Sequence, residues 1–134
     1  CDRLQELNIP PSVQCIGHSA FFRCKRLRSV TLPDCLTELA PWTFAECDSL
    51  LWITLPRSLT VIGNHCFHSC ISPGGITFHE GVRSIGKYAF RRCSCLTSVK
   101  LPSCLTVIGV RAFEACNLDT HTQGQIRAIN SKAL

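Results

Sequence analysis

Apolar residues recur along this chain at an unbroken interval of 23 residues. The most regular column is aromatic and consists of Phe21, Phe44, Phe67, Phe90 and Phe113. A unit of this length cannot bury its own apolar side, whereas stacked units bury it between them. The period therefore predicts a solenoid, of mainly β or α/β type, with about five 23-residue coils that start near residues 4, 27, 50, 73 and 96.

Each coil opens with a stretch in which apolar and polar residues alternate. In the second coil Val30 and Leu32 are apolar, whereas Ser29 and Thr31 are polar. A period of two is typical of a half-buried strand, and strands at the same phase of successive coils run parallel. We therefore expect one parallel strand per coil, which ends at a proline in most coils because proline has no N–H for a ladder.

The fourth coil departs from this pattern. Pro73, Gly74 and Gly75 stand at the start of its strand segment, and His79 replaces the closing proline. Proline and glycine weaken the interior of a strand, so a weakened or bulged strand is expected there.

The second half of each coil has a shorter extended piece, around Val13 to Ile16 in the first coil, and then a glycine column. This column consists of Gly17, Gly63, Gly86 and Gly109. Glycine adopts positive φ without steric cost, so we expect these residues to make a turn of that kind. The chain then crosses the coil, and the phenylalanine fills its interior.

Taken together, these columns are similar to one known family. The stretch Thr-Val-Ile-Gly-x-x-Ala-Phe-x-x-Cys, with Leu-Thr-Ser-Val-x-Leu-Pro before it, resembles the BspA-type leucine-rich repeat. The resemblance implies a right-handed leucine-rich repeat superhelix over residues 1–118 and a broad role in surface adhesion or scaffolding. The columns fail in residues 119–134, which form either a degenerate coil or a C-terminal cap or tail. Ile126 and Ile129 either restart a coil or belong to a helical lid.

Cysteine makes up 11 of the 134 residues, a density that suggests a disulfide framework in a short secreted chain. Position argues otherwise, because six cysteines fall on the 23-residue grid. They are Cys1, Cys24, Cys47, Cys70, Cys93 and Cys116. This column should point inward, where a thiol packs as a small apolar group and is usually inert. We therefore expect reduced, structural thiols.

One short stretch concentrates possible metal ligands, with His65, Cys66, His68 and Cys70 in six residues. Imidazole and thiolate are the ligands that zinc prefers. Both thiols fall on inward columns, however, whereas the two histidines do not. We therefore expect no metal and no cofactor, and these four residues are the weaker alternative.

Charge and hydropathy narrow the choice of partner. Fourteen Lys and Arg against nine Asp and Glu give a net charge of +5, which is too small an excess to indicate nucleic-acid binding. No apolar run approaches the roughly 20 residues that span a bilayer, so no membrane insertion is expected in this segment. Methionine is absent, so the chain is either processed or excerpted. Because the end of a solenoid exposes its core and Cys1 starts in mid-coil, we expect further repeats of the same chain, at least on the N-terminal side. Cell surface and cytoplasm both stay open as the location.

The outward positions of the predicted strands form a candidate binding surface. Its residues are Arg28, Thr31, Leu51, Trp52, Thr54, Thr77 and Lys100. A projecting Trp52 in a polar setting is typical of protein recognition, and the alternative is that its ring covers the edge of a neighbouring coil. A second, convex patch would hold Trp42, Tyr88 and Arg111.

No catalytic motif occurs in the sequence, so the leading hypothesis is a non-catalytic protein–protein interaction module. The resemblance extends this hypothesis to a segment of a cell-surface adhesin. The runner-up is an intracellular scaffold or a targeting repeat of a larger protein, which free thiols favour. An enzyme that depends on a metal or a thiol is the third reading.

Overall fold

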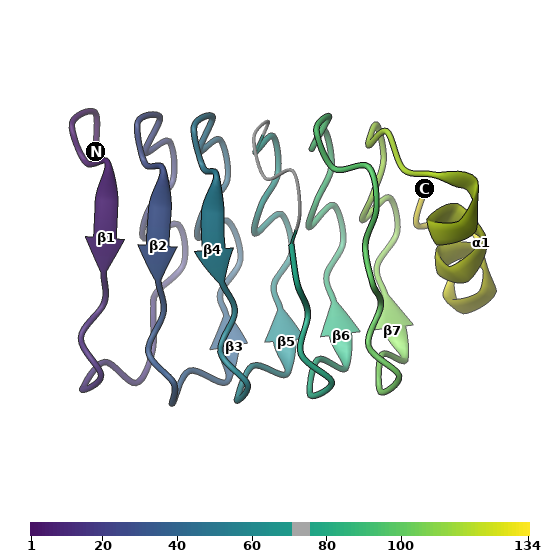
Figure 1. Cartoon of the computed structure of the whole chain (residues 1–134), viewed down its shortest axis with the longest axis horizontal. Helices are drawn as coiled ribbons and strands as arrows, with labels where there is room; N and C mark the ends of the chain where they lie inside the picture. Colours follow the sequence, from purple (N-terminus) through teal and green to yellow (C-terminus); the bar gives the residue numbers. More distant parts are fainter. Residues whose placement is uncertain (71–75) are drawn as a thin grey trace.

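The computed structural model describes residues 1–70 and 76–134. The chain winds into a stack of coils, with its two termini at opposite ends of the stack (Figure 1). Two parallel sheets form along this stack. The first sheet contains β1 (Glu6–Asn8), β2 (Ser29–Thr31) and β4 (Trp52–Thr54). The second contains β3 (Glu38–Leu39), β5 (Val61–Ile62), β6 (Ser84–Ile85) and β7 (Val107–Ile108).

Strand pairing follows the sequence period residue by residue. Leu7 pairs with Val30, which pairs with Ile53, and the second sheet aligns Leu39, Ile62, Ile85 and Ile108. Residues that pair in neighbouring strands are thus one repeat apart in the sequence. The predicted solenoid of parallel strands is confirmed.

Strand pairing is distributed unequally between the first and the second half of a coil. Among the described residues, the first three coils have a strand at their start, whereas residues 76–79 and 98–100 form no strand. In these later coils the parallel strand lies in the second half, as β6 and β7. The bulge expected at Pro73, Gly74 and Gly75 lies outside the described residues.

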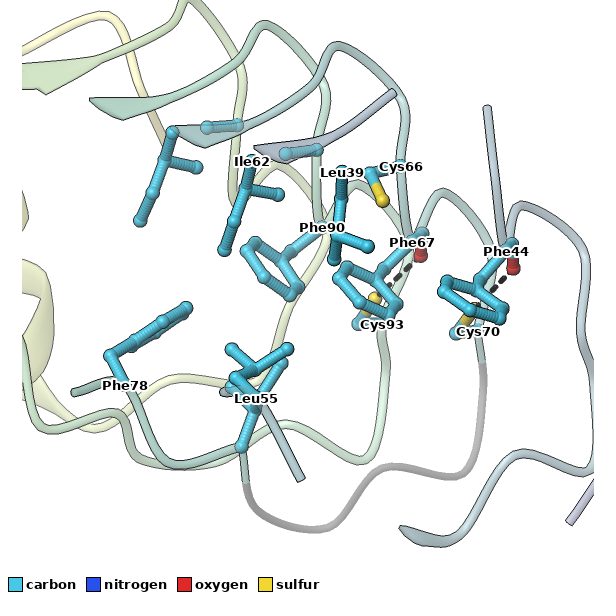
Figure 2. Close-up of a cluster of buried hydrophobic side chains, with 14 of the residues drawn as sticks. Leu39, Phe44, Leu55, Ile62, Cys66, Phe67, Cys70, Phe78, Phe90 and Cys93 are labelled. Atoms are coloured by element: carbon cyan, nitrogen blue, oxygen red, sulfur yellow. Dashed lines mark hydrogen bonds between the residues drawn. The ribbon is translucent and has the colours of Figure 1, made fainter. Parts of the chain in front are cut away.

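The phenylalanine column forms the centre of the core, as predicted. Successive rings are stacked with centroid separations of 5.2 to 5.7 Å and interplanar angles of 9 to 12°, and Figure 2 shows three of them in a row. Phe44, Phe67, Phe90 and Phe113 are buried, whereas Phe21 in the first coil is half-buried. Each coil therefore covers the ring of its neighbour.

The cysteine column is inward from Cys24 to Cys93, as predicted, and half-buried at Cys116, whereas Cys1 is exposed because the described chain has no coil before it to cover it. The column also makes hydrogen bonds that the sequence did not suggest. The Cys70 thiol donates to the carbonyl oxygen of Phe44 at 3.0 Å, and Cys93 donates to Phe67 at 3.1 Å (Figure 2). Cys47 and Cys116 repeat the contact, each to the phenylalanine 26 residues earlier. All 11 cysteines are free thiols.

The prediction that the glycine column supplies positive φ is wrong. No described glycine has a positive φ. A methyl group at Gly109 would instead lie 2.3 Å from the backbone nitrogen of Lys87, and one at Gly63 would lie 2.6 Å from the carbonyl oxygen of Leu39. Glycine is needed here because the backbones of adjacent coils approach too closely for a side chain.

Positive φ occurs instead at non-glycine residues in two columns of the following turn. One column is Ser19, Trp42, His65, Tyr88 and Arg111, and the other is Arg23, Glu46, Ser69, Arg92 and Ala115. Trp42, His65 and Tyr88 have φ of 63, 57 and 57°, a conformation that costs energy for such residues. The turn is held in place by its hydrogen bonds to the next coil, for example from His65 N to Lys87 O at 2.9 Å and from Phe67 N to Ala89 O at 2.8 Å.

The C-terminal residues combine a helix with a return to the coil. Helix α1 (Thr120–Ile129) begins after Asp119, whose carboxylate accepts from Thr122 N at 2.7 Å. It buries Ile126 and lies at the C-terminal end of the stack (Figure 1). With 10 residues, α1 is too short to cross a bilayer, and no other helix of the described chain could do so.

The last residues then take the positions of a following coil. The side-chain amide of Asn130 donates to Ile108 O at 2.7 Å, where the other coils use the backbone N–H of the glycine column. Lys132 O and Ala133 O accept from the N–H groups of Arg111 and Phe113. These contacts satisfy the backbone groups of the last coil.

Candidate interaction surface

Strand β4 presents Trp52, the largest and most exposed of the exposed apolar side chains in the described part of the chain. Ile53 faces the core, so the alternation of the strand turns Trp52 outward, with 74% of its surface exposed. The preceding Leu51 is 47% exposed. The prediction that Trp52 projects from the strand agrees with this exposure.

Backbone pairing places most of the predicted surface residues side by side. Leu51 N and Trp52 N both donate to Arg28 O, at 2.8 and 3.0 Å. Thr31 pairs with Thr54 in the register of β2 and β4, and both are exposed. These five residues therefore occupy neighbouring backbone positions on two adjacent coils.

A groove lies beside β4. One hollow is lined by Trp52, Ile53, Thr54, Leu55, Thr77 and His79. A second shares Thr54, Leu55 and His79 with it and extends to Thr31, Asp34 and Arg57. We call their union the β4 groove; it reaches from Trp52 at one end to Arg57 at the other.

Asp34, Arg57 and His79 are polar groove residues that the predicted surface lacks. The sequence did carry a signal for His79, because this residue stands in the proline column. It places an imidazole, which can donate a hydrogen bond, where other coils have a proline ring without an N–H. Arg57 gave no such signal, since exposed arginines are common on any surface. Arg57, His79 and Glu80 line a further hollow at this end.

Lys100 is exposed but lies on a later coil, away from β4. Lys100 lowers the pKa of Glu80, which lines the further hollow with Arg57 and His79, although the hydrogen bonds from the hydroxyl and N–H of Ser103 lower that pKa more. No described contact joins Lys100 to Trp52.

The second predicted patch is a stacked column rather than a free surface. The Trp42 indole stacks on His65 with 4.1 Å between centroids, and His65 stacks on Tyr88 with 4.8 Å. Trp42 and Tyr88 are only half-exposed, whereas Arg111 is exposed and lies within 3.7 Å of Glu114.

The four candidate metal ligands do not converge. Cys66 and Cys70 are buried in the core, whereas the rings of His65 and His68 pack on Trp42 at the turn. Within residues 1–70 and 76–134, no group of three His, Cys, Asp or Glu is placed to hold a metal ion.

Most of the ladder thiols are poorly suited to act as nucleophiles. Burial raises the pKa of Cys47 to about 12 and also raises that of Cys70, and the thiolate is the reactive form. Cys116 differs, because its hydrogen bond with the Cys93 thiol lowers its pKa. It is half-buried at the end of the ladder.

A family profile described as the BspA type leucine-rich repeat region matches residues 1–119 in six copies. The chain belongs to the BspA-type leucine-rich repeat family. The predicted resemblance is thereby confirmed, and the repeat columns above are those of this family. Comparison with the curated proteins gave no significant match.

Solved leucine-rich repeat proteins from bacteria share the fold. The leucine-rich repeat protein of T. pallidum has 30% sequence identity and a TM-score of 0.81, over 86% of this chain and 56% of that protein. A leucine-rich cell surface protein of Faecalibacterium prausnitzii has 27% identity and a TM-score of 0.69, over 87% of this chain and 38% of that protein. A leucine-rich repeat protein of Bacteroides ovatus, with 21% identity and a TM-score of 0.50, covers 89% and 43%. This chain thus spans about half the length of the T. pallidum protein, and less of the other two.

Proposed function

We propose that this BspA-type repeat is a non-catalytic protein-interaction module that binds a partner protein along the outer face of β1, β2 and β4. The observation that carries the proposal is Trp52, an aromatic ring that is 74% exposed on a strand whose position is fixed by its ladder. Binding energy at protein interfaces concentrates on tryptophan, tyrosine and arginine. A partner that covers Trp52 and Leu51 removes a large apolar area from water.

The β4 groove supplies the polar contacts beside this anchor. Hydroxyl groups of Thr31, Thr54 and Thr77 line it, and Arg57 stands at the end opposite Trp52. An apolar centre with a polar rim is the usual anatomy of a protein interface. Arg28 and Lys100 are then rim cations, which affect the association rate more than the affinity.

Adhesion at a cell surface is the version of this function that the relatives support, because one structural neighbour is described as a cell surface protein. An intracellular scaffold or targeting repeat is the alternative. The free thiol ladder supports the alternative, since disulfides are common in oxidising compartments and rare in reducing ones. Both versions fit a chain that spans part of longer repeat proteins, and we propose that further repeats flank it.

The enzyme reading has a direct test. Metal analysis of the purified protein should find no stoichiometric zinc, because the candidate ligands do not converge. Stoichiometric zinc that is lost in a His65→Ala, His68→Ala double variant would overturn the non-catalytic assignment.

The binding face can be tested without knowing the natural partner. A phage-displayed library of random peptides is selected on the immobilised chain, and the selected peptides are measured against Trp52→Ala and Val107→Ala. Val107 is the matched control, because it is also apolar and exposed, at 53%, but lies in the second sheet. We expect Trp52→Ala to weaken binding about 30-fold, as for a hot spot of about 2 kcal/mol, and Val107→Ala to leave it unchanged. Peptides that bind Trp52→Ala as well as the parent chain would contradict the proposal.

A further inference from the structure

Two histidines lie in an aromatic cluster that the proposed function does not use. The His65 ring is sandwiched between Trp42 and Tyr88, with interplanar angles of 7 and 20°. The His68 ring lies edge-on to Trp42 and to His65, at centroid separations of 5.9 and 5.7 Å. Trp42, His65 and Tyr88 come from three successive coils, so the cluster holds these coils together at the turn.

Both histidines have a ring nitrogen without a hydrogen-bond partner. The Nδ1 atoms of His65 and His68 are buried, and neither has a partner in the described part of the chain. A neutral imidazole has one N–H and one bare nitrogen, whereas imidazolium has an N–H at both positions. A buried N–H without an acceptor is unfavourable. The geometry therefore favours neutral rings that carry their proton on Nε2.

The surrounding charges act mostly in the same direction. Burial lowers the pKa of both histidines, and the Arg91 guanidinium lowers it further. His65 and Arg92 also lower the pKa of His68, which Glu46 opposes. Glu46 itself accepts from Arg23 at 2.7 Å, and Arg91 is hydrogen-bonded to Glu114.

One interaction favours the charged form. The faces of Trp42 and Tyr88 attract a cation placed over them, so stacking favours protonated His65. This attraction provides neither histidine with an acceptor for Nδ1. It also leaves the repulsion from Arg91 in place.

We propose that His65 and His68 form an acid-sensitive latch, in which protonation of both rings opens the Trp42–His65–Tyr88 stack and loosens this turn from the adjacent coils. Histidine in the unfolded chain binds its proton near pH 6.5, whereas the folded cluster binds it at lower pH. Stability is therefore complete above about pH 6.5 and falls as the pH drops below that value, where the unfolded state binds more protons.

The fluorescence of Trp42 reports the latch directly. The chain has two tryptophans, so Trp52→Phe leaves Trp42 as the one tryptophan, and its emission is followed from pH 8 to pH 5. We expect emission to change with a midpoint below about 6.5. The change should be absent in a His65→Asn, His68→Gln double variant, in which asparagine is chosen because it tolerates the φ of 57° at position 65. A His18→Gln, His121→Gln variant is the control, because both of these histidines are exposed, and it should keep the transition.

A second measurement needs no substitution. Long-range proton–nitrogen spectra of the parent chain identify the tautomer and the titration midpoint of each histidine. We expect the Nε2–H tautomer at neutral pH and midpoints below about 6.5 for His65 and His68. The proposal is overturned if either histidine titrates at or above that value, if Trp42 emission stays constant between pH 8 and pH 5, or if the emission change survives in the double variant.

Discussion

Replacement of Phe67 by alanine tests the central physical claim, that each coil is stabilised by the rings of its neighbours. Phe67 is fully buried in the middle of the column. Its ring centroid is 5.7 Å from that of Phe44 and 5.2 Å from that of Phe90. The substitution therefore removes one ring and two stacked contacts at once.

The magnitude follows from burial and from the rigidity of the cavity. Burial of a phenylalanine side chain contributes about 1.5–3 kcal/mol, and each aromatic pair adds roughly 0.5–1.5 kcal/mol. The coils cannot close the space, because their separation is fixed by hydrogen bonds such as that from Phe67 N to Ala89 O at 2.8 Å. We expect a loss of about 3–5 kcal/mol, the range observed when a buried phenylalanine becomes alanine.

Urea denaturation followed by circular dichroism measures this loss in the free energy of unfolding. A domain of this size has about 5–15 kcal/mol in total, so Phe67→Ala should be strongly destabilised and is close to unfolding at the lower end of this range. Trp52→Ala is the control and should change the value by no more than about 0.5 kcal/mol, because the ring is exposed. If Trp52→Ala proved the more destabilising of the two, the inward and outward columns would be assigned wrongly.

Three further substitutions test other contacts between coils, each by the free energy of unfolding. Gly109→Ala should cost at least about 1–3 kcal/mol, because the methyl group meets the backbone of the preceding coil. Gly17→Ala is the control and should be nearly neutral, because no atom lies within 4 Å of the added methyl group. Equal losses in the two variants would exclude close approach as the reason for glycine. Cys93→Ala should cost about 1–2 kcal/mol, because it removes buried volume and the donor to Phe67 O. A neutral result would show that the hydrogen bond from the Cys93 thiol is unimportant for stability. Asn130→Ala should cost about 1 kcal/mol and speed amide exchange in the last coil; unchanged exchange would contradict its role at that end.

Much of the fold follows from the sequence because a repeat multiplies its own signal. Five phenylalanines at one phase identify an inward column far more securely than any single residue does. The cysteines from Cys24 to Cys93 on the same grid are likewise buried, whereas Cys1 is exposed, and Trp52 lies outside.

The reasons for particular residues were harder to predict, because they depend on the distance between coils. Glycine suggested a positive φ, but the structure places positive φ at Trp42 and His65 and uses Gly63 for close approach. Periodicity can be seen in the sequence alone, whereas close approach depends on the distance between the backbones of two coils. The same limit applies to the hydrogen bond that the Cys70 thiol donates to Phe44 O.

By itself, the sequence determined the period, the parallel stacking and the side of each column that faces the core, because a 23-residue unit can hide its apolar residues only against copies of itself. The tertiary structure decided which side chains meet across coils. It brought His79 and Arg57 into one groove with Thr54 and closed the last coil with the amide of Asn130. Those contacts depend on the lateral spacing and the ends of the stack, and neither is written in the repeat pattern.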